Sequence, residues 1–278
     1  MFEIYDGDWL RNCDPESEEF KAAMLNGEDT GYDDPMHYYN LADMLGVPCM
    51  WKASGEHFCK MPKDQVFRYQ EYPGTIVERY WQSERCHGHE RPYMDELERA
   101  CDEYVADHPE LQTAIEELCA PGSFFVHLRV GDMGVVGSDT LEDLSKSLLM
   151  YENQEGNKIK NIYICTGVHA NWANLPEQHR SLPWQPETPT GVFQCVADSL
   201  KIMTMMFPKA KLITGDVDPT FCLLRKAPAL FGSRGTFSVI LMLLNKNRTF
   251  SSRQVSHHIN AAWQYNPHVL DGLKLTRW

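Results

Sequence analysis

The chemically most suggestive part of this sequence is a short motif, His-x-Arg-x-Gly-Asp, at residues 127–132. It overlaps an apolar, β-prone run at 124–128 that predicts a buried strand. Arginine carries a permanent charge on a planar fork that matches phosphate oxygens, and glycine lets the backbone approach an anion closely. We therefore predict that Arg129 and Gly131 bind a phosphate-bearing ligand at the strand end, where α/β sheets hold ligands. A surface ion pair between Arg129 and Asp132 beside an ordinary turn is the alternative.

A second stretch, residues 230–238, follows the same pattern with the sequence Leu-Phe-Gly-Ser-Arg-Gly-Thr-Phe-Ser. An apolar strand ends in Gly-Ser-Arg-Gly, and a helix is predicted to begin at Thr236, with Thr236 or Ser233 as its N-cap. A helix N-terminus attracts anions, and Arg234 adds a full positive charge. Taken alone, the stretch also fits an ordinary strand-turn-helix connection. If the two strands are parallel, both turns open on the same sheet edge and can hold a pyrophosphate from two sides.

The elements that position these motifs alternate regularly from residue 122 onward, which predicts an α/β fold with a parallel, doubly wound sheet. The expected strands are 124–128, 159–166, 211–214 and 229–232, and the expected helices between and after them are 140–151, 191–207, 219–227 and 236–244. Ser138 and Asp139 are expected to cap the first of these helices. Before residue 122 the sequence predicts helices at 16–25, 35–45, 92–105 and 109–119 and a strand at 47–51. We place a domain boundary after residue 121, giving domains 1–121 and 122–278.

Composition narrows the possible partners and compartments. A formal net charge of −13 argues against nucleic acid as a partner, because no basic surface is in evidence to neutralise phosphates. The nine cysteines are scattered without Cys-x-x-Cys spacing, a pattern typical of reduced thiols in a cytosolic compartment. The acidic N-terminus lacks an apolar signal region, and no apolar run is long enough to cross a bilayer. We therefore expect a soluble, cytoplasmic protein.

The two motifs carry a resemblance to a known enzyme group. Residues 127–132 resemble the His-x-Arg-x-x-Asp motif of the α1,2-, α1,6- and protein O-fucosyltransferases, and residues 236–238 (Thr-Phe-Ser) resemble their later Ser/Thr-Phe-Ser motif. The resemblance covers roughly residues 122–245. It implies a GT-B fold, in which two Rossmann-like domains hold a nucleotide-diphosphate sugar in the cleft between them. It also implies inverting sugar transfer to a glycan hydroxyl with no metal and no other cofactor.

The resemblance also implies roles for individual residues. Arg129 would contact the donor diphosphate, His127 would help to hold the nucleotide, and Asp132 would brace the loop or the arginine. Residues 236–238 would line the phosphate and base side of the pocket. The expected donor-binding residues are His127, Arg129, Gly131, Ser233, Arg234, Thr236, Phe237 and Ser238. The expected partners are a nucleotide-diphosphate sugar and an oligosaccharide or glycoprotein glycan as acceptor.

The catalytic base is left open by the sequence. An inverting transferase needs a carboxylate or histidine that takes the proton of the acceptor hydroxyl. The candidates are Asp132, which also has a structural explanation, Asp139, which also fits a helix cap, Asp34, and Glu142, which with Asp139 could replace the glutamate that some relatives use. With Arg129 as the group that stabilises the leaving diphosphate, Asp132 and Asp139 form the predicted catalytic set.

The donor sugar is open as well. Many relatives of the resembled group have an acidic pair after the second strand, where this chain has Cys165-Thr166-Gly167. The donor is therefore either GDP-fucose-like or a UDP-sugar such as UDP-xylose. The chain also resembles glycosyltransferases encoded by large algal viruses (chloroviruses), some of which transfer xylose. That resemblance implies an N-glycan xylosyltransferase in the host cytoplasm.

Three other classes of protein compete with this hypothesis. One is a non-catalytic nucleotide- or carbohydrate-binding module that keeps the fold without a working base. Another is a nucleotide-sugar hydrolase. The third is a metal-dependent GT-A enzyme, for which Asp216-Val217-Asp218 matches the Asp-x-Asp motif but is better explained as the start of a helix. Residues 86–89 (Cys-His-Gly-His) look metal-like, yet their spacing is not that of a zinc site, and we expect a polar turn there.

Overall fold

The computed structural model describes residues 2–25, 91–131, 133–155, 158–168, 189–215, 217–253 and 274–275. Its centre is a seven-stranded sheet. The strands are β1 (Glu3–Tyr5), β2 (Ser123–His127), β3 (Asn161–Cys165), β4 (Ala210–Thr214), β5 (Ala229–Gly232), β6 (Arg248–Ser251) and β7 (Lys274–Leu275). The helices are α1 (Gly7–Asn12), α2 (Glu18–Leu25), α7 (Arg91–Asp107), α8 (Pro109–Leu118), α9 (Ser138–Glu155), α10 (Pro189–Met206), α11 (Val217–Lys226) and α12 (Gly235–Leu244).

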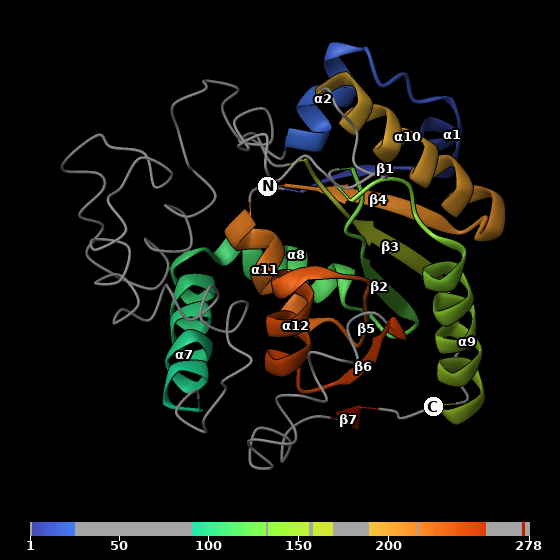
Figure 1. Ribbon diagram of the computed structural model, residues 1–278. Coiled ribbons are helices and arrows are strands. Elements are labelled where there is room, and N and C mark those ends of the chain that lie inside the picture. Colours follow the sequence, from blue (N-terminus) through green and yellow to red (C-terminus); the bar gives the residue numbers. More distant parts are fainter. Residues whose placement is uncertain are drawn as a thin grey trace, which may run out of the picture.

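The sheet has the order β1-β4-β3-β2-β5-β6-β7, and every neighbouring pair is parallel except β1 with β4. From β2 the chain moves outward through β3 to β4, then returns across the sheet to β5 and continues to β6 on the other side (Figure 1). The predicted α/β fold with a doubly wound sheet is therefore confirmed, and the predicted parallel pairing holds from β4 to β7, whereas the antiparallel β1 makes the sheet mixed. The direction of winding reverses between β2 and β5, and in open α/β sheets ligands bind at such a reversal, beyond the carboxyl ends of the strands.

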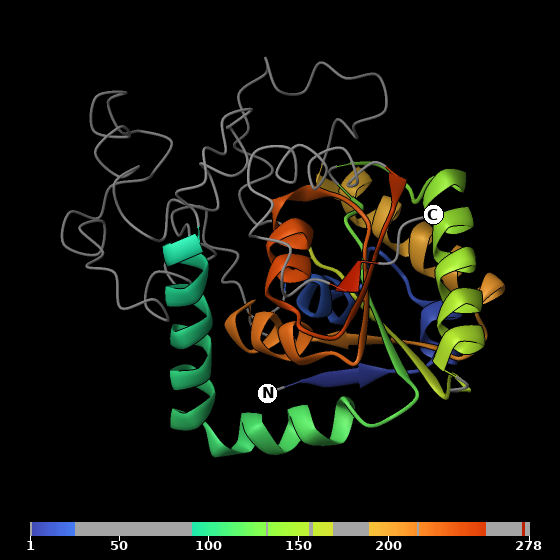
Figure 2. The ribbon, with the colours of Figure 1, turned by 90° about the horizontal axis from the view of Figure 1, so that it is seen from below.

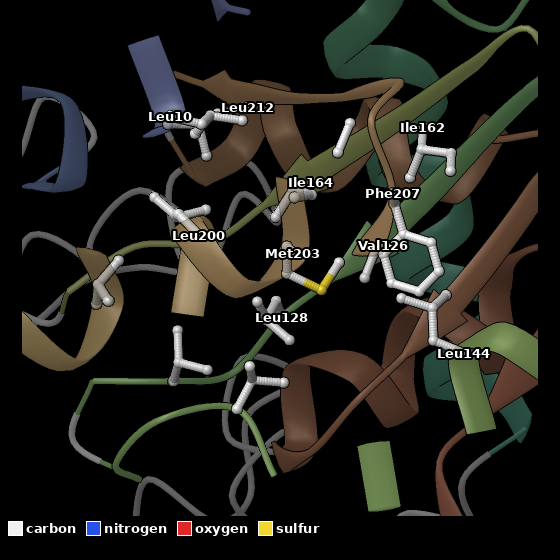
Figure 3. Packing of buried hydrophobic residues seen from close by; sticks show 14 of the residues in the cluster. Leu10, Val126, Leu128, Leu144, Ile162, Ile164, Leu200, Met203, Phe207 and Leu212 are labelled. Carbon is white, nitrogen blue, oxygen red and sulfur yellow. The ribbon is translucent and has the colours of Figure 1, made fainter. Parts of the chain in front are cut away.

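Helices cover both faces of the sheet, and each face has its own apolar core. One core lies under α1, α2, α9 and α10 and includes Phe124 of β2. Val126 of the same strand also lies in this core, close to Phe207 and Leu144 in Figure 3. The other lies under α7, α8, α11 and α12 and includes Phe125 of β2. The views in Figures 1 and 2 show α9 and α10 on one side of the sheet and α11 and α12 on the other. Because alternate side chains of β2 enter opposite cores, the strand is apolar at every one of these positions.

The N-terminal segment belongs to this same sheet. β1 pairs antiparallel with β4, from Glu3 opposite Thr214 to Tyr5 opposite Leu212. Leu10 of α1 and Phe20 of α2 are fully buried in the core that also contains α9 and α10. The boundary after residue 121 stays a prediction, and residues 2–25 lie on the sheet that follows it.

Most expected elements are found within a few residues of their predicted bounds. β1, α1, β6 and β7 were not predicted, and the expected helix 35–45 and strand 47–51 lie outside the described residues. α9 begins at Ser138 and not after it, so the prediction that Ser138 and Asp139 precede this helix as its cap is wrong. In the described part of the chain, no helix is both long enough and apolar enough to cross a membrane.

Candidate functional site

The two motifs lie side by side at the carboxyl edge of the sheet. His127, the last residue of β2, is paired with Gly232, the last residue of β5, in a parallel register. The backbone N–H of Ser233 donates to the carbonyl of His127 over 3.1 Å, which continues the ladder one residue past the strands. Both turns therefore open on the same edge, as expected for parallel strands, and they do so at the point where the winding reverses.

Serine hydroxyls join the turns that follow these strands. The backbone N–H of Arg129 donates to Ser233 Oγ over 2.7 Å, and Ser233 is buried. On the far side of β5, Ser252 N–H donates to the carbonyl of Gly232 over 3.0 Å, and the Ser252 hydroxyl donates to the carbonyl of Ser233. The turns after β2, β5 and β6 thus form one hydrogen-bonded unit.

The start of α12 differs from the predicted cap. The N-cap residue is Arg234, in an extended conformation, and its side chain makes no capping hydrogen bond. Ser233 instead accepts from Arg129, so the prediction that Ser233 caps this helix is wrong. Thr236 lies in the first turn of α12, two residues past the N-cap position, and its side chain is outside the description. The first-turn amides of α12 therefore have no capping side chain from the N-cap residue, which is the condition under which a helix N-terminus takes an anion.

Arg234 adds a partly buried cation at this helix start. Burial lowers the pKa of its guanidinium from the ordinary value, and the charge of Asp139 opposes that shift. Asp139 therefore lies within electrostatic range of Arg234, although the two residues are far apart in sequence. An arginine stays protonated under any ordinary condition, so Arg234 presents a permanent charge in a partly desolvated position.

His127 is connected to α12 through Ser238. Its Nδ1 lies 2.6 Å from Ser238 Oγ, and the Ser238 hydroxyl donates to the carbonyl of Arg234 over 2.9 Å. The imidazole also lies against the ring of Phe237, with ring centroids 4.8 Å apart and planes inclined at 38°. Three residues predicted as donor-binding, His127, Phe237 and Ser238, are thus in direct contact although they come from different motifs.

The glycines after β2 shape the turn that follows Arg129. Gly131 and Gly134 both have φ of 79° and exchange two backbone hydrogen bonds of 3.0 and 2.8 Å, which closes a tight loop. A Cβ on Gly131 would lie 3.0 Å from Val192 Cγ1 of α10. Gly131 was predicted as a ligand-binding residue. The structure gives a further reason for glycine at position 131, because the left-handed backbone and the close packing on α10 both require it.

Of the carboxylates considered as catalytic base, Asp139 and Glu142 lie within the described residues. Asp139 is exposed in the first turn of α9, and its Oδ1 is 3.8 Å from Arg253 Nη1. Asp132 and Asp34 lie outside the described residues, as do Asp216 and residues 86–89. The described residues directly after β3, 166–168 (Thr-Gly-Val), include no acidic side chain, and Thr166 is buried.

Arg253 and Ser252 are site residues that sequence reasoning missed. Arg253 follows the end of β6 by two residues, as Arg129 follows β2 and Arg234 follows β5, and the ends of these three strands are in register. Its Nη2 donates over 2.9 Å to the buried carboxylate of Asp143, and its backbone N–H donates to the same carboxylate over 2.8 Å. The repeated Ser-Arg pair after a short β-prone run was the available signal.

Charge pairing fixes Arg253 onto α9. The hydrogen bonds that Arg253 donates to Asp143 and Glu142 raise the pKa of its guanidinium, and hydrogen bonds from Lys146 and Arg253 lower the pKa of Glu142. Because Arg253 also faces Asp139, one arginine connects the end of β6 with the start of α9. The carboxyl edge therefore combines three arginines, a helix N-terminus and a histidine.

A separate hollow of about 560 Å³ lies along α7, away from this edge, and is lined by Glu98, Arg99, Asp102, Glu103, Ala106 and Lys246. Its acidic groups are paired. Asp102 binds the buried Arg225 and lies 3.0 Å from Lys226 Nζ, and Glu98 pairs with Lys246. Burial would raise the pKa of Asp102, but hydrogen bonds from Arg225 and Lys226 outweigh it and the pKa is lowered. This network fixes α7 to α11 and the end of α12, so we regard it as structural.

Among the described residues, no group of three or more His, Cys, Asp or Glu side chains is placed to hold a metal ion. The six described cysteines are free thiols. Comparisons of the chain with protein-family models, with curated proteins and with solved structures gave no match.

Proposed function

We propose that this chain is an inverting, metal-independent glycosyltransferase that holds a nucleotide-diphosphate sugar at the carboxyl edge between β2 and β5. The observation that carries the proposal is the joining of the two motifs at the reversal point of the sheet. His127 pairs with Gly232, and the backbone of Arg129 is bonded to Ser233. A nucleotide bound there would meet Arg129 from one turn and Arg234 with the α12 N-terminus from the next.

The chemistry of transfer fits a site of this kind. A base takes the proton of the acceptor hydroxyl, the acceptor oxygen bonds to C1 of the sugar, and the bond from C1 to the phosphate oxygen breaks. The bonding electron pair leaves with the diphosphate, where negative charge develops. Preorganised cations and helix amides stabilise that charge without a metal. Arg129, Arg234 and the first turn of α12 are the groups proposed for this task.

The proposal extends to a GT-B arrangement with the predicted domains 1–121 on the acceptor side and 122–278 on the donor side, with β1, α1 and α2 of the first domain packed on the donor-side sheet. The donor is GDP-fucose-like, or a UDP-sugar such as UDP-xylose, and the acceptor is a glycan hydroxyl. Free thiols at all six described cysteines fit a reducing compartment such as the cytoplasm.

A thermal-shift experiment tests the donor site. A ligand that binds only the folded chain at about 100 times its Kd adds about 2.7 kcal/mol of stability. The purified chain is screened against GDP, UDP, CDP and their sugars, with and without EDTA. We expect one nucleoside diphosphate to raise the Tm whether or not EDTA is present. A GDP-selective shift points to a fucosyl-type donor, a UDP-selective shift to a pentosyl- or hexosyl-UDP donor, and no shift with any nucleotide contradicts the proposal.

Substitution of Arg129 by Ala is the matching variant, and Arg99→Ala is its control. Arg99 is an exposed arginine of α7 paired with Glu103, far from the sheet edge. We expect Arg129→Ala to lose the nucleotide shift while its circular dichroism stays unchanged, and Arg99→Ala to keep the shift. A normal shift in a folded Arg129→Ala protein would contradict the central role of this arginine.

Transfer itself separates the proposed enzyme from its rivals. The donor identified by the screen is incubated with glycan acceptors, and release of nucleoside diphosphate and of free sugar is followed. Acceptor-dependent release of nucleoside diphosphate supports a transferase. Equal release of free sugar with and without acceptor indicates a hydrolase, and binding without any turnover indicates a non-catalytic module.

A further inference from the structure

The contact between His127 and Ser238 determines which nitrogen of the imidazole carries the proton. Ser238 Oγ has one proton to donate and lies near two groups, Nδ1 of His127 at 2.6 Å and the carbonyl of Arg234 at 2.9 Å. A carbonyl oxygen can only accept. If the hydroxyl donated its proton to Nδ1, its oxygen would face the carbonyl oxygen with no proton between them, and the two oxygens would repel each other. If Nδ1 carries a proton, both contacts become hydrogen bonds, from Nδ1–H to Oγ and from Oγ–H to the carbonyl.

The second arrangement gives both Nδ1 and the Ser238 hydroxyl a hydrogen-bond partner, and a missing partner is costly here because Ser238 is fully buried. The neutral ring of His127 is then the Nδ1–H tautomer, and its Nε2 is an acceptor. Whatever else the ring contacts, a neutral His127 in this state receives a proton or a hydrogen bond at Nε2 and donates none there.

That conclusion changes the role of His127 in the candidate site. A phosphate oxygen accepts hydrogen bonds, so it is a poor partner for an unprotonated Nε2. A hydroxyl group donates one, so it is a good partner. His127 also stands at the end of β2, two residues before Arg129, on the edge where the sugar and its acceptor meet in the proposed reaction.

We propose that His127 is the catalytic base of this reaction and that Ser238 is the residue that positions it, an inference that rests on the proposed function. Nε2 takes the proton of the acceptor hydroxyl while the acceptor oxygen bonds to C1 of the sugar. The C1–phosphate bond breaks, and its electron pair leaves with the diphosphate. Ser238 holds the ring through Nδ1 and stabilises the imidazolium that forms, as an orienting group does in a nucleophile-base-orienter arrangement. Phe237 packs against the ring and limits its rotation.

The tautomer is tested first, because the test needs no ligand. Two-bond ¹H–¹⁵N correlation spectra of ¹⁵N-histidine-labelled full-length protein distinguish the two neutral tautomers. His108 is an internal standard, since its Nδ1 lies 2.7 Å from the carbonyl of Tyr104 and must therefore be protonated. The His127 signals are identified by their absence from His127→Asn. We expect His127 to show the same Nδ1–H pattern as His108, and Ser238→Ala to convert it largely to the Nε2–H form. An Nε2–H pattern in the wild-type protein overturns the proposal even if the protein binds a nucleotide.

The catalytic role is tested with His127→Asn, whose amide nitrogen can still donate toward Ser238 but which has no basic nitrogen. We expect turnover with the donor and acceptor from the transfer assay to fall by about 10²- to 10⁴-fold. Nucleoside diphosphate affinity, measured by calorimetry, should change less than about threefold. A loss of nucleotide affinity comparable to that of Arg129→Ala would show that His127 is a phosphate ligand and would overturn the proposal. If no nucleotide binds the wild type at all, the proposed function fails, whereas the tautomer assignment is judged by the spectra alone.

Discussion

Replacement of Ser233 by Ala tests whether the two motifs form one structural unit. Ser233 Oγ accepts the backbone N–H of Arg129 over 2.7 Å. Alanine removes one hydrogen bond and leaves the Arg129 N–H without this acceptor. A net hydrogen bond contributes about 0.5–1.5 kcal/mol, and a buried unsatisfied donor costs about 1–3 kcal/mol. Because Arg129 is only half-buried, water can partly replace the serine, and we expect a loss of about 1–2 kcal/mol in the free energy of unfolding.

Urea unfolding followed by circular dichroism measures this loss, with the slope against denaturant checked to be unchanged. Ser145→Ala is the matched control. Its hydroxyl donates to the carbonyl of Leu141 one turn earlier in α9, so its removal leaves no donor unsatisfied. The free energy of unfolding should therefore change by no more than about 0.5 kcal/mol. Ser233→Ala should also weaken nucleotide binding, since the turn that carries Arg129 loses a tether. If Ser233→Ala were as stable as Ser145→Ala, the proposed bond between the two turns would not contribute to stability and the reasoning would be refuted.

Three further predictions concern the turn after β2, the α7 ion pairs and the buried thiols. Gly131→Ala should lower the free energy of unfolding by about 1–3 kcal/mol, because φ is 79° and the new Cβ would lie 3.0 Å from Val192. Gly137→Ala, where a Cβ meets nothing within 4 Å, should be nearly neutral in the same urea titration. The pKa of Asp102 is lowered in the folded chain, so its ion pairs stabilise the fold fully above the ordinary value of 3.8 and are lost as the pH falls through the folded value. Urea titrations of wild type and Asp102→Asn should therefore differ at neutral pH and converge well below pH 3.8, and a difference that persisted there would count against the assignment. Burial raises the pKa of Cys119 to about 12, so at pH 8 its alkylation by iodoacetamide, followed by peptide mass spectrometry, should be about 1,000-fold slower in the folded than in the urea-unfolded chain. Comparable rates in the two states would contradict the raised pKa of this partly buried thiol.

The elements that sequence reasoning found share a physical cause. β2, β3 and β5 are covered by helices on both faces, so their residues are apolar almost without interruption and the runs are easy to recognise. The helices between them have an apolar side that faces the sheet and are bounded by Gly, Pro or Ser. Local sequence therefore carried enough information to predict the winding of the sheet and the meeting of the two motifs at its edge.

The missed elements depend on contacts that lie far away in the sequence. β1 has three residues, mostly exposed, and is a strand because it pairs with β4 more than two hundred positions later. β6 mixes polar Thr249 and Ser251 with buried Phe250, and its strand character comes from its parallel pairing with β5. Without β6 the sequence could not place Ser252 and Arg253 at the sheet edge. The bond between His127 and Ser238 is likewise tertiary, which is why the sequence left the base undecided among carboxylates.

The register of the sheet explains why the arginines of this chain recur where they do. His127, Gly232 and Ser251 end three adjacent parallel strands in register. A residue two positions further along each chain segment therefore lies at a similar distance beyond the carboxyl edge of the sheet. Arg129, Arg234 and Arg253 occupy those positions. Arg253 is paired with the carboxylates of α9, and Asp139 of the same helix also acts electrostatically on Arg234. Burial lowers the pKa of Arg234, and a partly desolvated cation gains more from an anion than an exposed one does. Because the register of the sheet brings Arg129 and Arg234 to one edge beside the N-terminus of α12, this edge is where we propose that the diphosphate binds.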